Sequence, residues 1–173
     1  MAPEGKATGT PWMVEFGPYR VIGVGGVSRN DNGECSALWE RDFLPRLGEI
    51  AKLPGDTPFF GICRCVPGAT DGSFEYIAAV PVAADAPIPA GMMEAQIAAA
   101  IYLVFPVAGL AEIGQAWGQI GPWMEAHPEW EGYCDPAGCD CATYPGFELY
   151  PPTFGSDGRL FIYVPVKRTS KDG

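Results

Sequence analysis

The chain has 173 residues, 47% of them hydrophobic and 18% charged, which suits one domain with a substantial core. Its 23 glycines and 18 prolines are about twice the usual share, which excludes a long helical bundle and favours short elements joined by turns. The net charge of −10 argues against a nucleic-acid partner, because an acidic chain repels phosphates. The single histidine, His127, excludes metal sites built from several histidines.

No targeting signal or membrane segment is predicted. The first twelve residues lack the apolar stretch of a secretory signal, and we expect a flexible leader over residues 1–12. The longest uncharged apolar stretch, residues 97–111, is shorter than the roughly 18 residues that a membrane span needs. We therefore expect a cytoplasmic protein with no membrane partner, whose cysteines are mostly free thiols.

The first half of the chain has the pattern of a strand, a helix and two strands. A run rich in β-branched and aromatic residues predicts a strand over 16–27. Apolar residues at every third or fourth position predict an amphipathic helix over 36–53, which Pro45 kinks. Two further strands are predicted over 59–66 and 74–82, joined by a hairpin-type loop.

The second half repeats this order. A strand is predicted over 96–107, followed by a helix over 110–126 that Pro122 interrupts. Strands over 147–150 and 159–167 close the chain.

Both halves end in Val-Pro-Val, at residues 80–82 and 164–166, and we interpret them as a repeat. A chance recurrence in a chain rich in valine and proline is the alternative. Neither half is long enough to bury its own sheet, so the two are expected to pack as one pseudo-twofold domain. The second half carries a short insertion, which we place in the cysteine-rich segment 133–144.

Several segments, taken in order, resemble the gyrase-inhibitor-like, or bacterial effector-binding, domains. The most specific are Phe-Glu-Tyr, Ile-Pro-Ala-Gly, Phe-Glu-Leu-Tyr and the final Ile-Tyr-Val-Pro-Val. The resemblance implies an α+β fold: two pseudo-twofold βαββ half-domains, a curved antiparallel sheet, two main helices and a central ligand cleft. It covers residues 13–168, with halves of about 13–84 and 85–168, and leaves a tail over 169–173.

The resemblance also implies a function. Residues 1–12 are too few for a DNA-binding helix-turn-helix, so we expect a standalone member that binds hydrophobic, planar or cationic small molecules and needs no cofactor. Two alternatives stay open: a cofactor-free hydrolase of cyclopropane-bearing alkylating natural products, and a protein-binding module that modulates gyrase. The sequence decides neither the ligand nor the oligomeric state.

Glu148 is the first candidate site residue. It lies between apolar residues in a short strand, where an unpaired carboxylate is costly to bury, and Tyr150 faces the same side. A carboxylate beside a phenol attracts cations, as in the multidrug sensors of the family. If the protein is an enzyme, Glu148 and Tyr150 are the expected catalytic pair. The alternative is an exposed salt bridge. Glu75 in Phe-Glu-Tyr is the near-equivalent in the first half; for it a solvated glutamate on a hairpin is the favoured interpretation, and a place in the cleft is the alternative.

Aromatic side chains on the predicted strands and helices complete the expected cleft, because rigid flat walls suit varied planar ligands. Packing in the core is the alternative for each of them. The expected ligand-binding residues besides Glu148 and Tyr150 are Trp39, Tyr76, Phe105, Trp123 and Tyr163.

The cysteines do not follow a usual metal-binding pattern. Cys134, Cys139 and Cys141 have the spacing C-x4-C-x-C, and Cys63 and Cys65 lie two apart on a predicted strand. Because zinc sites usually combine four ligands at CxxC-like spacings, we expect no metal and a loop with free thiols. A disulfide within the loop, or a zinc site with His127 as fourth ligand, are the alternatives.

Overall fold

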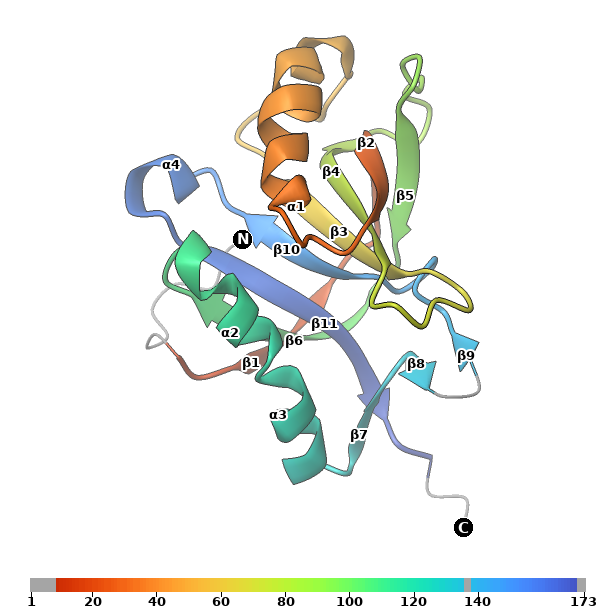
Figure 1. The fold of residues 1–173 in the computed structure, drawn as a ribbon, viewed down its shortest axis with the longest axis vertical. Coiled ribbons are helices and arrows are strands. Elements are labelled where there is room, and N and C mark those ends of the chain that lie inside the picture. Colours follow the sequence, from red (N-terminus) through yellow and green to blue (C-terminus); the bar gives the residue numbers. More distant parts are fainter. Residues whose placement is uncertain (1–8, 136–137, 171–173) are drawn as a thin grey trace.

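The structure is a computed structural model that describes residues 9–135 and 138–170 (Figure 1). Most of the expected leader, residues 1–8, and the last three residues of the expected tail lie outside the described residues. The described residues form a curled antiparallel sheet with helical segments on one face, which confirms the predicted α+β fold class.

Six strands form the centre of the sheet in a symmetric order. They run β2-β4-β3-β10-β11-β6, so the first strand of each half is outermost and β3 pairs with β10 in the middle. The first half contributes β2 (Tyr19–Ser28), β3 (Phe59–Cys65) and β4 (Phe74–Val82). The second half contributes β6 (Ala100–Val107), β10 (Gly146–Tyr150) and β11 (Leu160–Arg168).

Two additional strands exchange between the halves. The strand β1 (Trp12–Phe16) pairs with β6 of the second half, and β5 (Met93–Ile97) pairs with β2 of the first half. The prediction of one continuous strand over 16–27 and another over 96–107 is therefore wrong where each run divides, between β1 and β2 and between β5 and β6. Gly17 takes a positive φ of 88°, which favours glycine, and a Cβ there would lie 2.8 Å from the Ala98 carbonyl oxygen. The two connections thus lie directly against each other.

Both predicted helices form, but each is divided into short pieces. The first comprises α1 (Glu34–Ala37), the π-helix η1 (Leu38–Phe43) and the 3-10 helix η2 (Leu44–Glu49). The second comprises the 3-10 helix η3 (Leu110–Glu112), α2 (Ile113–Trp117) and α3 (Ile120–Ala126). Pro45 and Pro122 each lie in the first turn of a new piece, where the missing N–H leaves no helical bond unmade.

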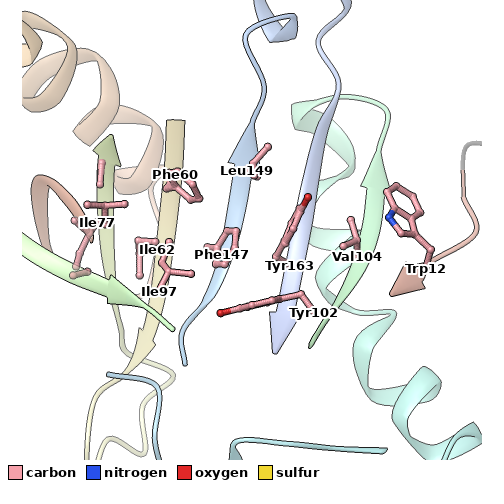
Figure 2. Close-up of a cluster of buried hydrophobic side chains, with 13 residues drawn as sticks. Trp12, Phe60, Ile62, Ile77, Ile97, Tyr102, Val104, Phe147, Leu149 and Tyr163 are labelled. Carbon is pink, nitrogen blue, oxygen red and sulfur yellow. The ribbon is translucent and has the colours of Figure 1, made fainter. Parts of the chain in front are cut away.

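The opposite face of the sheet carries the largest aromatic cluster of the core (Figure 2). Phe147 stacks on Tyr163 with ring centroids 4.9 Å apart, and Tyr102 packs against both. Side chains alternate along a strand, so Phe147 and Leu149 point into this cluster. Glu148 and Tyr150 consequently face the helices.

The remaining elements are short. The strand β7 (Trp130–Gly132) pairs with β11, and β8 (Cys134–Asp135) pairs with β9 (Gly138–Cys139) as a separate ribbon in the insertion. The helix α4 (Phe154–Asp157) connects β10 to β11. None of the helices in the described part of the chain has the length and apolar character of a membrane span.

Candidate functional site

A cavity of about 780 Å³ lies over the centre of the sheet, between the two helical segments. Strands β3, β4 and β10 supply its floor, while α1 with η1 and η3 with α2 supply its two sides. Aromatic side chains from every one of these regions line it, joined by one from α4: Trp39, Phe59, Phe74, Tyr76, Trp117, Tyr150 and Phe154.

Glu148 lies on the floor of this cavity and is only 6% exposed. Its Oε2 accepts two hydrogen bonds, from the Tyr76 hydroxyl at 2.8 Å and from the Tyr150 hydroxyl at 2.7 Å. The Trp39 indole Nε1–H donates to the Tyr76 hydroxyl at 2.8 Å, which leaves that hydroxyl's proton directed at the carboxylate. The four side chains form a connected polar network on the floor of a largely aromatic cavity.

Burial raises the pKa of Glu148 above its ordinary value of 4.5, and the hydrogen bonds from Tyr150 and Tyr76 oppose this rise, with a smaller opposing contribution from Trp117. The carboxylate accepts from two phenol hydroxyls, and no lysine or arginine lines the described cavity. Burial also raises the pKa of Cys35 to about 11 and that of Tyr76 well above its usual range, and in both the charge of Glu148 adds to the rise. These neighbours therefore stay neutral beside the carboxylate.

Gly61 makes room for the network. It pairs with Glu148 across the β3–β10 junction. A Cβ on Gly61 would lie 2.3 Å from the Tyr76 hydroxyl oxygen and 2.8 Å from Glu148 Oε2, closer than atoms can approach. The hydrogen bond between Tyr76 and Glu148 thus requires glycine at this position.

A second carboxylate lies at the edge of the cavity. Glu40, on η1, lines it and is exposed at its edge. The walls are rigid, because Trp39 packs edge-on against Tyr150 at 5.2 Å and Tyr150 packs against Phe154 at 5.0 Å. The arrangement offers a flat apolar surface together with uncompensated negative charge, which is the complement of a hydrophobic cation.

The structure brings together four of the seven expected ligand-binding residues: Trp39, Tyr76, Glu148 and Tyr150 all line the cavity. The other three, Phe105, Trp123 and Tyr163, are not among the residues that line the cavity. Phe105 is 1% exposed and packs in the core beneath the second helix. Trp123 stacks on His127 with centroids 4.0 Å apart. Tyr163 pairs with Phe147 and so points to the opposite face of the sheet.

Two further residues bear on the site: one carboxylate that lies outside it and one indole that lines it. Glu75 does not line the cavity; it forms an ion pair with Arg64, its cross-strand neighbour. Trp117, which is not among the expected ligand-binding residues, lines the cavity from α2 as Trp39 lines it from η1. That correspondence between the halves was the signal for its place in the site.

Comparisons with known proteins agree with this architecture. Residues 13–166 match the family described as integron-associated effector binding protein. The transcriptional regulator BrlR of Pseudomonas aeruginosa is 30% identical over 159 residues, which cover 89% of this chain and 54% of the regulator. The chain thus spans about half the length of that relative.

Two solved structures share the fold. An integron cassette protein from the mobile metagenome of Vibrio cholerae aligns over 91% of this chain and 95% of its own, with TM-score 0.60 and 16% identity. The protein SAV2435, solved bound to tetraphenylphosphonium, aligns over 91% and 94% with TM-score 0.58 and 16% identity. With the family match over most of its length, the chain belongs to the integron-associated effector-binding proteins, within the gyrase-inhibitor-like superfamily.

Proposed function

We propose that this protein binds hydrophobic, planar or cationic small molecules in the cavity, with Glu148 as the counter-charge for cations. The observation that carries the proposal is a buried carboxylate on the floor of an aromatic cavity whose described lining contains no basic side chain. The tetraphenylphosphonium bound to the structurally similar SAV2435, a bulky lipophilic cation, supports this class of ligand.

The geometry favours a cation for an electrostatic reason. The two phenol hydroxyls stabilise the charge of Glu148 only partly, since burial still holds its pKa above the ordinary value. A cation in the cavity would supply the missing positive charge where water is scarce, and charges interact more strongly there than in bulk solvent. The faces of Trp39 and Trp117 would add cation–π attraction.

Calorimetry with two ions of nearly equal shape tests the proposal. Tetraphenylphosphonium and tetraphenylborate differ in the sign of their charge, so shape and hydrophobicity are matched. We expect the wild-type protein to bind the phosphonium and to reject the borate. The Glu148→Gln substitution should weaken phosphonium binding by at least about tenfold, because the amide keeps the shape but removes the charge.

The matched control is Glu40→Gln, which removes an exposed carboxylate from the edge of the same cavity. Exposed charges are screened by solvent, so its effect should be within about threefold. Equal affinities of the wild type and Glu148→Gln for the phosphonium would contradict the proposal, and so would tighter binding of the borate.

The hydrolase alternative is favoured by one feature of the same site. A carboxyl group with a raised pKa, hydrogen-bonded to phenols, is suited to general acid–base catalysis. Incubating the protein with a cyclopropane-bearing alkylator, followed by mass spectrometry, separates the two functions. Binding without a ring-opened product leaves the receptor function alone, while a product lost in Glu148→Gln supports the enzyme. A cytoplasmic location and the absence of a nucleic-acid partner stay predictions.

A further inference from the structure

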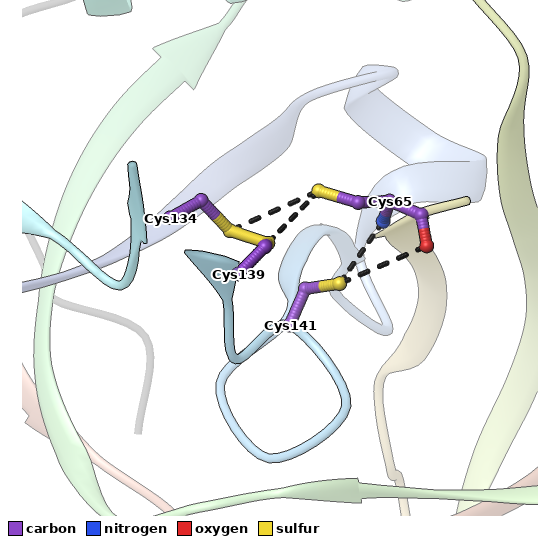
Figure 3. Close-up of a disulfide and its surroundings, with 4 residues drawn as sticks. All are labelled: Cys65, Cys134, Cys139 and Cys141. Atoms are coloured by element: carbon purple, nitrogen blue, oxygen red, sulfur yellow. Dashed lines mark hydrogen bonds between the residues drawn. A yellow bond between two sulfur atoms is a disulfide. The ribbon is translucent and has the colours of Figure 1, made fainter. Parts of the chain in front are cut away.

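Four cysteine sulfurs converge at the end of β3, away from the network around Glu148 (Figure 3). They come from separate parts of the chain: Cys65 ends β3, Cys134 lies on β8, Cys139 lies on β9, and Cys141 follows β9. All four Sγ atoms lie within 4.8 Å of one another. The sequence pattern C-x4-C-x-C shows only three of them, because Cys65 comes from a strand about seventy residues earlier.

We propose that, in the reduced protein, Cys65, Cys134, Cys139 and Cys141 bind one zinc ion as four thiolates. Zinc in structural sites is four-coordinate and tetrahedral, with Zn–S bonds of about 2.3 Å, so neighbouring sulfurs lie about 3.8 Å apart. The Sγ of Cys65 is already 3.8 Å from that of Cys134 and 3.0 Å from that of Cys139. Once the bond between Cys134 and Cys139 is reduced, their two sulfurs would have to separate to a similar distance to surround one ion with Cys65 and Cys141.

The surrounding backbone is arranged as in a ligand shell. The Cys65 backbone N–H donates to Cys141 Sγ at 3.0 Å, the kind of outer hydrogen bond that orients a thiolate ligand and offsets its charge. The insertion is held in shape by the stacked rings of Tyr133 and Tyr144, with centroids 3.9 Å apart. The Asp140 N–H also donates to the Tyr133 carbonyl oxygen at 3.0 Å, which joins the described residues on the two sides of the β8–β9 ribbon.

The structure joins Cys134 and Cys139 by a disulfide, which is the oxidised, metal-free alternative. A disulfide between these two residues gives no role to Cys65 and Cys141, whose sulfurs nevertheless lie against it. Reduction by a cellular thiol reductant breaks the S–S bond with two electrons and two protons and yields two thiols. Binding of Zn²⁺ then forms four Zn–S bonds and releases four protons, which leaves a closed structural site with no position for substrate.

The site would link the insertion to the strand that forms part of the cavity floor. Cys65 ends β3, and Cys63, two residues earlier, lines the cavity. A bound zinc ion would therefore stabilise the folded protein without touching a ligand, and its test is independent of the binding experiment above.

The test measures metal content and thiol ligation in the full chain, reduced with a phosphine and reconstituted with zinc alone. We expect one zinc per chain by elemental analysis after gel filtration. Replacement by Co²⁺ should give the visible bands of a tetrahedral site and near-ultraviolet thiolate charge-transfer bands. Cys65→Ser and Cys141→Ser, which both leave the Cys134–Cys139 pair intact, should each lose at least about tenfold in zinc affinity. Cys35→Ser, which replaces a thiol outside the cluster, should bind zinc as tightly as the wild type.

Chelation tests the same site without a substitution. Removing zinc from the reduced wild type should lower its melting temperature by several degrees, and adding zinc back should restore it. The proposal is overturned if the reduced wild-type chain takes up no zinc, or if Cys65→Ser binds zinc as tightly as the wild type.

Discussion

The two halves of the molecule meet at the β3–β10 pair, and there the repeat is broken. If Val80 corresponds to Val164, the pairing of β3 with β4 and of β10 with β11 makes Gly61 the counterpart of Glu148. These two residues also face each other across the junction. One half thus supplies the carboxylate and the other supplies the space beside it. The repeat builds the scaffold, and its departure from symmetry builds the site.

The flanking positions show the same division. Cys63 corresponds to Tyr150, and both line the cavity. Only Tyr150 reaches the carboxylate with a hydroxyl, while on the opposite side Tyr76 of β4 fills the volume that Gly61 leaves. A symmetric pair of glutamates would place two negative charges together in a buried site, which is strongly unfavourable.

Adding a side chain at position 61 should disturb the hydrogen bond between Tyr76 and Glu148 more than any other substitution described below. Gly61→Ala forces the Tyr76 hydroxyl and the Glu148 carboxylate apart, and we expect it to lower the free energy of unfolding by about 1–3 kcal/mol, as overpacked cores do. Urea denaturation measures this. The control is Gly26→Ala on β2, where a Cβ would meet no atom within 4 Å. Equal stabilities of the two variants would show that the close approach is not needed.

Removing one phenol hydroxyl at a time compares the two hydrogen bonds that the Glu148 carboxylate accepts. Tyr150→Phe removes one hydrogen bond and should cost about 1 kcal/mol, whereas Tyr76→Phe also leaves the Trp39 N–H without its acceptor and should cost about 2 kcal/mol. Denaturation of both variants at neutral pH gives the comparison. In a Trp39→Phe background the extra cost of Tyr76→Phe should shrink. Equal costs in the native background would contradict the described network.

The pH dependence of binding depends on the charge of Glu148. Because its folded pKa is raised, the carboxyl is neutral at acidic pH, and phosphonium affinity should rise with pH from about 4.5 through that pKa, by at most about tenfold per unit. In the free protein the unfolded chain releases this proton first, so wild-type stability relative to Glu148→Gln should fall over the same range. Calorimetry and denaturation across pH measure the two trends. A flat wild-type affinity would exclude Glu148 as the counter-charge.

The smallest effect is expected at Glu75, whose charge already has a partner. Glu75→Gln removes a half-buried cross-strand ion pair with Arg64 and should cost less than about 1 kcal/mol. Its phosphonium affinity should stay within about twofold of the wild type. A loss as large as that of Glu148→Gln would restore Glu75 as a part of the site.

The repeat, the strands and the divided helices could be predicted because they depend on local properties. Alternation along a strand places Glu148 and Tyr150 on one face whatever the rest of the chain does. The strand exchange was missed for two different reasons. The break after Phe16 falls at Gly17-Pro18, a turn signal that the prediction of one continuous strand passed over, whereas the break after Ile97 falls within a continuous apolar run and has no local signal. Which partner a strand chooses depends on packing that involves the whole chain.

The partners of the candidate residues are likewise a matter of tertiary structure. The sequence determined that Glu148 has no charged neighbour in its own strand, but the approach of Tyr76, 72 residues away, depends on the register of three strands and on the missing side chain of Gly61. Register also turned Tyr163 into the core and brought Cys65 to the cysteines of the insertion. Local chemistry decides which face a side chain takes, and only the assembled sheet decides what it meets there.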